Sequence, residues 1–142
     1  MEKRIGFVGL GDMGVPMAGR LADAGLNPQV WSRRLVSAEP VIARGADRAA
    51  SLDDLFTACD RVVMMLADAV AMDEVLARGM PDFAVRVQGV TLIHMGTTPP
   101  GYSKLLEKDV LAAGGQYAEI PVSGSTGPAA TGDLVAMTAG SG

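Results

Sequence analysis

Residues 9–14 read Gly-Leu-Gly-Asp-Met-Gly, and they overlap the end of an apolar run at residues 5–10. Directly after the run, Met13, Met17 and Leu21 recur at every fourth position, which is the spacing of one face of a helix. An apolar strand, a turn with three spaced glycines and a helix together form the G-x-G-x-x-G unit of dinucleotide-binding folds. The order of these segments therefore predicts a strand–turn–helix unit at the start of an α/β domain.

Each of the three glycines has a separate physical role in such a unit. Gly9 permits the tight turn, Gly11 lets the backbone approach a pyrophosphate, and Gly14 lets the helix pack close to the sheet. The start of the helix then offers unpaired N–H groups and the positive end of its dipole to the phosphates. We therefore predict a dinucleotide-binding turn made of Gly9, Leu10, Gly11, Asp12, Met13 and Gly14. The alternative is a glycine-rich strand–helix turn that binds no ligand.

Short apolar runs alternate with segments of helical spacing along the chain. The apolar runs are residues 5–10, 29–31, 62–66, 90–95 and 117–120. Gly25, Gly45, Gly79 and Gly114 follow helical segments, where a left-handed residue ends a helix, and Ser51 begins another helix as its N-cap. Continuous apolar runs are typical of parallel strands covered on both faces. The sequence predicts one doubly wound α/β domain over residues 1–142, with a mostly parallel sheet and helices on both faces.

The end of the second apolar run carries an unexpected charge. Dinucleotide-binding folds that use NAD commonly place Asp or Glu about 20 residues after the glycine turn, where it binds the ribose hydroxyls. Here the residues are Ser32, Arg33 and Arg34, and no carboxylate occurs between Asp23 and Glu39. Two guanidinium groups beside a hydroxyl suit a 2′-phosphate, which an acidic side chain would repel. We predict NADP(H) as the cofactor, with NAD kept as an alternative; otherwise Arg33 and Arg34 form a solvated corner.

Charge and composition exclude several classes of partner. The chain has 12 basic and 16 acidic residues and a net charge of −4, without a run of like charges, which argues against a nucleic-acid or membrane-surface module. No apolar stretch approaches the roughly 18 residues of a membrane span. The first residues lack the longer apolar region and small-residue cleavage site of a signal peptide, so we expect none. The one cysteine, Cys59, allows no internal disulfide, which suits the cytoplasm. No residues have the spacing of metal ligands or of a nucleophile and its base, so we predict no metal.

Residues 5–18, Ile-Gly-Phe-Val-Gly-Leu-Gly-Asp-Met-Gly-Val-Pro-Met-Ala, resemble the opening of the β-hydroxyacid dehydrogenases. This family includes 3-hydroxyisobutyrate dehydrogenases, tartronate semialdehyde reductases and glyoxylate/succinic semialdehyde reductases, with imine reductases as relatives. The resemblance implies a Rossmann domain like the NAD-binding domain of 6-phosphogluconate dehydrogenase. It extends over nearly the whole chain, which corresponds to about half of a family member.

Several later segments also resemble parts of the family. Residues 32–34 stand where the family contacts the adenosine ribose, and Met65 with Leu66 stands in a turn that lies against the cofactor. In Met-Gly-Thr-Thr-Pro-Pro at residues 95–100, Thr97 stands where a threonine faces the nicotinamide half. Pro-Val-Ser-Gly-Ser at residues 121–125 resembles a segment that holds the substrate carboxylate, which implies that Ser123 and Gly124 bind the substrate.

Five departures from the family pattern lie in or next to these loops. Gly96 replaces a usual serine, and this removes a hydroxyl near the substrate. Ala67 replaces a proline and Ser125 a second glycine. His94 stands where Asp is frequent, and residues 119–120 are Glu-Ile where Asp-Ala is frequent. These departures leave the identity of the substrate more open than the class of reaction.

The resemblance assigns no catalytic residue to this chain. In the family, the proton-donating lysine lies on a helix of an all-helical second domain, so we expect it beyond Gly142 and expect a truncated, inactive fragment. The lysines present, Lys3, Lys104 and Lys108, precede the first strand or lie within a helix. His94 is the remaining acid–base candidate, although a strand histidine is more often hydrogen-bonded in place.

Together these features predict the cofactor-binding part of an NADP(H)-dependent oxidoreductase. Hydride would pass between nicotinamide and a small hydroxy acid, semialdehyde or 2-oxo acid, whose carboxylate is the expected small-molecule partner. The resemblance also implies a homo-oligomer for the full-length enzyme. An imine reductase and a non-catalytic dinucleotide-binding module are the alternatives.

Overall fold

The fold is described from a computed structural model, which covers residues 4–66, 68–96, 98–120, 122–123 and 135–136. The strands are β1 (Arg4–Val8), β2 (Gln29–Trp31), β3 (Asp47–Arg48), β4 (Cys59–Met64), β5 (Thr91–His94), β6 (Gln116–Glu119), β7 (Val122–Ser123) and β8 (Val135–Ala136). The α-helices are α1 (Gly14–Asp23), α2 (Glu39–Ile42), α3 (Leu52–Ala58), α4 (Ala69–Leu76), α5 (Asp82–Val87) and α6 (Pro100–Ala112), with a 3-10 turn, η1 (Leu35–Ala38), before α2.

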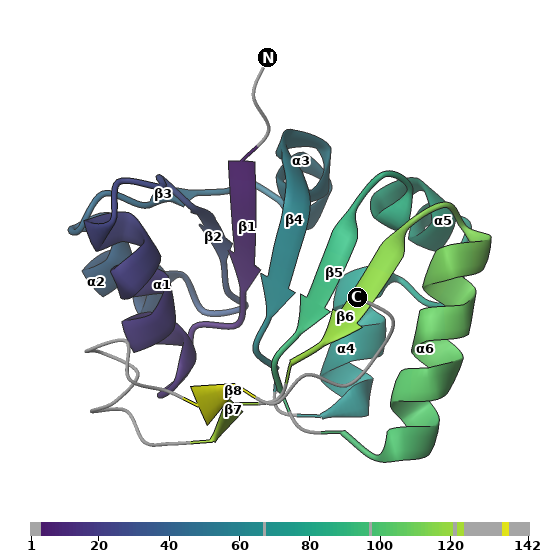
Figure 1. Cartoon of the computed structure of the whole chain (residues 1–142). Helices are drawn as coiled ribbons and strands as arrows, with labels where there is room; N and C mark the ends of the chain where they lie inside the picture. The colour runs from purple at the N-terminus through teal and green to yellow at the C-terminus, as the bar shows by residue number, and fades with distance from the viewer. Residues whose placement is uncertain (1–3, 67, 97, 121, 124–134, 137–142) are drawn as a thin grey trace.

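The main sheet has six parallel strands in the order β3-β2-β1-β4-β5-β6 (Figure 1). In the centre, Phe7 of β1 lies opposite Val30 of β2 on one side and Val63 of β4 on the other. The chain runs outward from β1 to β3, returns to β4 and runs outward again to β6. The strand order therefore reverses between β1 and β4, and ligands of open α/β sheets bind beyond the carboxyl ends of the strands at such a point.

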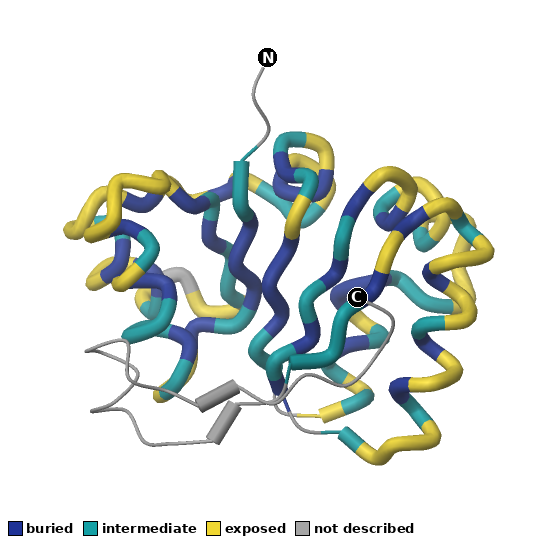
Figure 2. Tube along the Cα trace, in the orientation of Figure 1, coloured by how far each residue is buried: buried dark blue, intermediate teal, exposed yellow. Residues whose placement is uncertain are grey.

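Helices cover both faces of the sheet, as the sequence predicts. Neighbouring strand residues point to opposite faces, and Phe7 and Val8 of β1 belong to two separate buried clusters. The cluster with Phe7 includes Ala18 and Val41 from α1 and α2. The cluster with Val8 receives its helical residues from α3, α4, α5 and α6. Figure 2 shows that the central strands are buried while the outer surfaces of the helices are exposed.

The predicted helix signals are confirmed except at the end of α4. Ser51 is the N-cap of α3, and its Oγ accepts a hydrogen bond of 3.1 Å from the backbone N–H of Asp54. Gly25, Gly45 and Gly114 follow α1, α2 and α6 with a positive φ, as a helix end favours. At the end of α4 the left-handed residue is Ala77 (φ +58°), and Gly79, which also has a positive φ, lies two residues further on. None of the helices in the described part of the chain has the length and apolar character needed to cross a bilayer.

The strands differ from the apolar runs at their ends. The runs at residues 5–10, 62–66 and 90–95 extend past the carboxyl ends of the strands, and these extra residues form the edge loops. The sequence did not predict β3, because Asp47 and Arg48 are polar and exposed and only backbone pairing with β2 makes them a strand. Residues 122–123 also pair antiparallel with residues 135–136 as a small second sheet at the carboxyl edge (Figure 1).

Leu92→Ala tests the cluster between the sheet and α3–α6. Leu92 is fully buried in β5, so removing its side chain should lower the free energy of unfolding by about 2–5 kcal/mol. Leu105→Ala is the matched control, because Leu105 is 61% exposed on α6 and should change stability by less than about 0.5 kcal/mol. Urea unfolding of both variants measures the difference. Equal losses would contradict the assignment of this core.

Candidate functional site

The carboxyl ends of four strands form one continuous edge. Backbone hydrogen bonds extend the ladder beyond the strands: Met65 N–H donates to Val8 (2.9 Å), Met95 N–H to Met64 (3.1 Å) and Ile120 N–H to His94 (2.9 Å). The loops after β1, β4, β5 and β6 therefore begin side by side. The switch point between β1 and β4 lies within this edge, so it is the candidate site.

Gly9 and Gly14 have the structural roles that their spacing predicts. Gly9 has a φ of +102°, and a Cβ on it would overlap the backbone oxygen of Met65. Gly14 is the first residue of α1, and a Cβ there would overlap the carbonyl oxygen of Gly9. Only glycine therefore allows the sharp turn beside the β4 loop and the close packing of α1 on β1.

The middle of the turn is open to solvent. Gly11 and Asp12 are exposed, and a Cβ added at Gly11 would meet no atom within 4 Å. Met13 is the N-cap residue of α1, but no side chain caps this helix start. Leu10 is buried against α1 and α2, so its backbone rather than its side chain is available at the edge. The turn can thus bring an anion to uncapped N–H groups at a helix N-terminus.

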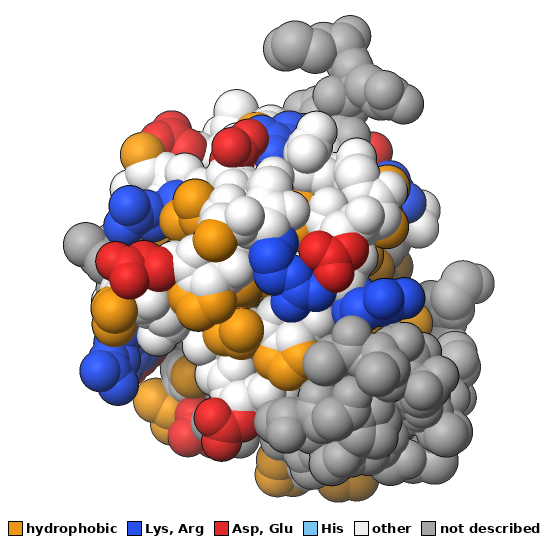
Figure 3. All heavy atoms as spheres, turned by 90° about the vertical axis from the view of Figure 1, so that its left-hand side faces the viewer, with side chains coloured by type: hydrophobic (Ala, Val, Ile, Leu, Met, Phe, Trp, Pro, Cys, Tyr) orange, Lys and Arg blue, Asp and Glu red, His pale blue; other side chains and the backbone are white. Residues whose placement is uncertain are grey.

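The residues after β2 lie next to a carboxylate that sequence reasoning missed. Ser32 is half-buried, and Arg33 and Arg34 are exposed. Arg33 forms an ion pair with Glu74 of α4, with 2.5 Å between Nη2 and Oε2. The Arg34 side chain forms no ion pair or hydrogen bond with the part of the chain that the structure describes. On the neighbouring face of α1 and α2, acidic and basic side chains are interspersed (Figure 3).

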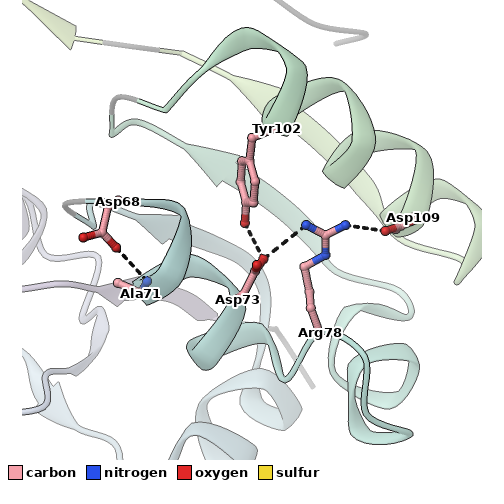
Figure 4. Close-up of polar contacts among 6 residues, drawn as sticks. All are labelled: Asp68, Ala71, Asp73, Arg78, Tyr102 and Asp109. Carbon is pink, nitrogen blue, oxygen red and sulfur yellow. Dashed lines mark hydrogen bonds and ion pairs between the residues drawn. The ribbon is translucent and has the colours of Figure 1, made fainter.

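A polar network holds α4, which carries Glu74, against α6 (Figure 4). Asp73 of α4 accepts hydrogen bonds from the Tyr102 hydroxyl of α6 (2.7 Å) and from Arg78 (3.1 Å). Arg78 also binds Asp109 of α6. At the other end of α4, Asp68 caps the helix by accepting a hydrogen bond of 2.8 Å from the N–H of Ala71. The helix is therefore fixed at both ends.

The loops after β4 and β5 approach each other closely. Met65 and Leu66 are half-buried at this edge. Gly96 is buried, and a Cβ on it would lie 2.5 Å from the backbone oxygen of Leu66. Gly96 therefore lets the two loops pack closely together. It also lacks the hydroxyl of the serine that is usual in the family at this position. The predicted residues Thr97 and Gly124 lie outside the described residues, and Ser123 is described only as a strand residue of β7.

His94 is buried at the end of β5 and holds the loop that follows. Its Nε2 lies 3.0 Å from the Oγ1 of Thr98, while its Nδ1 has no partner within the described residues. Burial lowers the pKa of His94, and the charge of Glu119 opposes this effect. A neutral, hydrogen-bonded ring is better suited to positioning the β5 loop than to donating protons. Lys104 and Lys108 lie exposed on α6.

Fold and edge geometry define an α/β domain of the dinucleotide-binding class. A family model described as the NAD binding domain of 6-phosphogluconate dehydrogenase matches residues 4–142, and the chain belongs to this family. This confirms the domain that the resemblance of residues 5–18 implies, a Rossmann domain like the NAD-binding domain of 6-phosphogluconate dehydrogenase.

Two curated relatives match almost the whole chain. Glyoxylate/succinic semialdehyde reductase 2 (chloroplastic) of Arabidopsis thaliana is 35% identical over 96% of the chain and 38% of the relative. The 2-hydroxy-3-oxopropionate reductase of Escherichia coli is 32% identical over 96% of the chain and 47% of the relative. The chain thus spans less than half the length of these two relatives.

Solved structures show the same fold. A reductive aminase from Aspergillus terreus in complex with NADPH and ethyl-5-oxohexanoate has a TM-score of 0.80, with 26% identity over 90% of this chain and 43% of that one. The 3-hydroxyisobutyrate dehydrogenase of Mycobacterium tuberculosis has a TM-score of 0.88, with 24% identity over 99% of this chain and 47% of that one. At 24% identity, the similarity to the 3-hydroxyisobutyrate dehydrogenase shows the fold alone.

A pair of glycine variants tests the geometry of the turn. Gly14→Ala should destabilise the fold by several kcal/mol, because its Cβ overlaps the Gly9 carbonyl. Gly11→Ala should leave the free energy of unfolding within about 0.5 kcal/mol of the original, because its Cβ points into open space. Thermal and urea unfolding compare the two. A Gly14 variant as stable as the Gly11 variant would contradict the close packing of α1 on β1.

The buried His94 ring predicts a pH-dependent stability. Because burial lowers its pKa in the folded chain, the unfolded chain takes up the proton more readily. The contribution is complete above the unfolded pKa of about 6.5 and is lost as pH falls from there toward the lower folded pKa. His94→Gln, whose amide can keep the Thr98 hydrogen bond without titrating, should show a flatter profile. Urea unfolding between about pH 7 and pH 5 measures both slopes, and equal slopes would refute this account.

Proposed function

We propose that this chain binds a nicotinamide dinucleotide across the carboxyl edge of the sheet, with the pyrophosphate on the glycine turn. The observation that carries this proposal is the turn itself: it lies at the switch point, exposes Gly11 and leads into the uncapped start of α1. Membership of an NAD-binding family supports the same assignment. The N–H of Gly9 donates to the carbonyl oxygen of Trp31 (3.2 Å), so Gly9 is proposed to shape the turn. The backbone N–H groups of Leu10, Gly11, Asp12, Met13 and Gly14 are the proposed phosphate ligands.

We propose NADP(H) as the preferred cofactor. Ser32, Arg33 and Arg34 follow β2 directly, and Arg34 is exposed and without an ion pair in the described part of the chain. Guanidinium groups bind phosphate through several charge-assisted hydrogen bonds. The similar reductive aminase was solved with NADPH, which supports this preference. NAD stays the alternative, since the same edge accepts either dinucleotide.

The proposed reaction is hydride transfer to or from a small hydroxy acid or semialdehyde. When bound, the nicotinamide supplies or accepts the hydride. Met65, Leu66 and Thr97 are proposed to position the cofactor, and Ser123 and Gly124 to bind the substrate carboxylate. The names of the two curated relatives, both reductases of small aldehydes or oxo acids, support this substrate class.

We propose that residues 1–142 form the NAD(P)-binding domain of a longer enzyme and that the proton donor lies outside them. The matched region covers 38% and 47% of the two relatives, so both are more than twice as long as it, and the described lysines, Lys104 and Lys108, are exposed on α6. Cytoplasmic location and a homo-oligomeric state stay predictions. An imine reductase stays the alternative enzyme, supported by the reductive aminase structure.

A paired titration tests the cofactor assignment. The double variant Arg33→Ala/Arg34→Ala should bind NADPH about 1.5–3 kcal/mol more weakly for each charged hydrogen bond lost, while NADH binding changes little. Arg20→Ala/Arg61→Ala is the matched control, because both arginines are exposed and lie away from the carboxyl edge. Protein fluorescence or calorimetry measures each affinity. An equal loss for NADPH and NADH would remove the 2′-phosphate assignment, and no binding of either by the folded chain would refute the proposed function.

A further inference from the structure

The contact between Arg33 and Glu74 joins two elements on either side of β1. Arg33 follows β2, whereas Glu74 lies on α4, which follows β4, and β1 separates β2 from β4 in the sheet. The ion pair, 2.5 Å between Nη2 and Oε2, therefore reaches past the strand that carries the glycine turn. It lies at the end of the edge where the adenosine ribose is proposed to bind. The Glu74 carboxylate therefore lies beside the end of β2, although no Asp or Glu occurs near Arg33 in the sequence.

The backbone of Glu74 is held in place by its helix and does not depend on Arg33. α4 is capped by Asp68 at its start, and Asp73, the residue before Glu74, is held by Tyr102 and Arg78 (Figure 4). Arg33 lies in a bend outside any helix or strand, and its side chain is 72% exposed. An exposed ion pair of this kind is weak and easily broken. When a ligand displaces it, both side chains are released, but the backbone of α4 keeps the Glu74 carboxylate near this end of the edge.

We propose that Glu74 is a specificity-determining residue that opposes a 2′-phosphate at Arg33. This inference rests on the proposed function and deepens it. A 2′-phosphate that binds Arg33 must first break its ion pair with Glu74, and it then lies near the negative charge of Glu74, which raises the free energy of bound NADP(H). NAD(H) carries a ribose hydroxyl there, which does not suffer this repulsion and can donate a hydrogen bond to a carboxylate. Arg34, which has no competing carboxylate in the described residues, is then the primary phosphate ligand.

The matched variants Glu74→Gln and Asp82→Asn test this inference. Both remove one exposed carboxylate, but Asp82 lies on α5 and has no ion pair with the described residues. At low salt, Glu74→Gln should bind NADPH about three- to tenfold more tightly and change NADH binding less than about twofold. Asp82→Asn should change neither affinity. Near 1 M salt, where the Debye length is about 3 Å, the gain from Glu74→Gln should largely disappear.

The outcomes separate this inference from the proposed function. If the unaltered chain prefers NADPH but Glu74→Gln leaves that preference unchanged, the role of Glu74 is refuted and the proposed function stands. If the unaltered chain prefers NADH and Glu74→Gln gains NADPH affinity, the inference holds and the NADP(H) preference is wrong. If the folded chain and both variants bind neither nucleotide, both proposals are overturned. Circular dichroism of each variant checks that the fold is unchanged.

Discussion

The arrangement of this domain depends on the close contact between the carbonyl of Gly9 and Gly14. The positive φ of Gly9 turns the chain sharply at the end of β1, and the missing side chain at Gly14 lets α1 begin directly against that turn. Because a Cβ on Gly9 would overlap the backbone of Met65, the same turn also fixes the distance to the loop after β4. One local constraint therefore sets both the direction of the α1 dipole and the width of the edge at the switch point.

The rest of the edge extends this constraint from strand to strand. The backbone bonds of Met65, Met95 and Ile120 continue the parallel ladder into the loops, so each loop begins in register with its neighbour. Buried Gly96 lets the β5 loop pass close to the oxygen of Leu66. The family resemblance suggests a serine at this position, and a serine here would require the two loops to separate. The departure at position 96 is therefore a change in the shape of the edge as well as in its hydrogen-bonding groups.

Local signals explain which features the sequence could predict. The turn at Gly9, the Ser51 cap and the alternation of apolar runs depend on neighbours within a few positions, and each is found in the structure. The sequence missed β3, whose pairing with β2 comes from backbone geometry alone. It also missed the contact of Arg33 with Glu74, because these residues are 41 positions apart and meet only when β4 returns beside β1. A sequence motif predicts the structure of a single segment. Contacts across the switch point depend on how the strands are ordered in the whole sheet.

This difference matters most for the charge at the end of β2. The rule that separates NAD from NADP considers the residue type after this strand, and here it counts two arginines and no acid. In the folded chain, Glu74 of α4 adds a carboxylate at this position. The position of α4 is set in turn by the hydrogen bonds of Asp73 with Tyr102 and Arg78. Because electrostatic interaction depends on distance in space, the arginine pair and Glu74 act on the ribose position together. Cofactor preference in such a domain is therefore a property of β2 and α4 jointly, and a reading of the β2 end alone overestimates its positive charge.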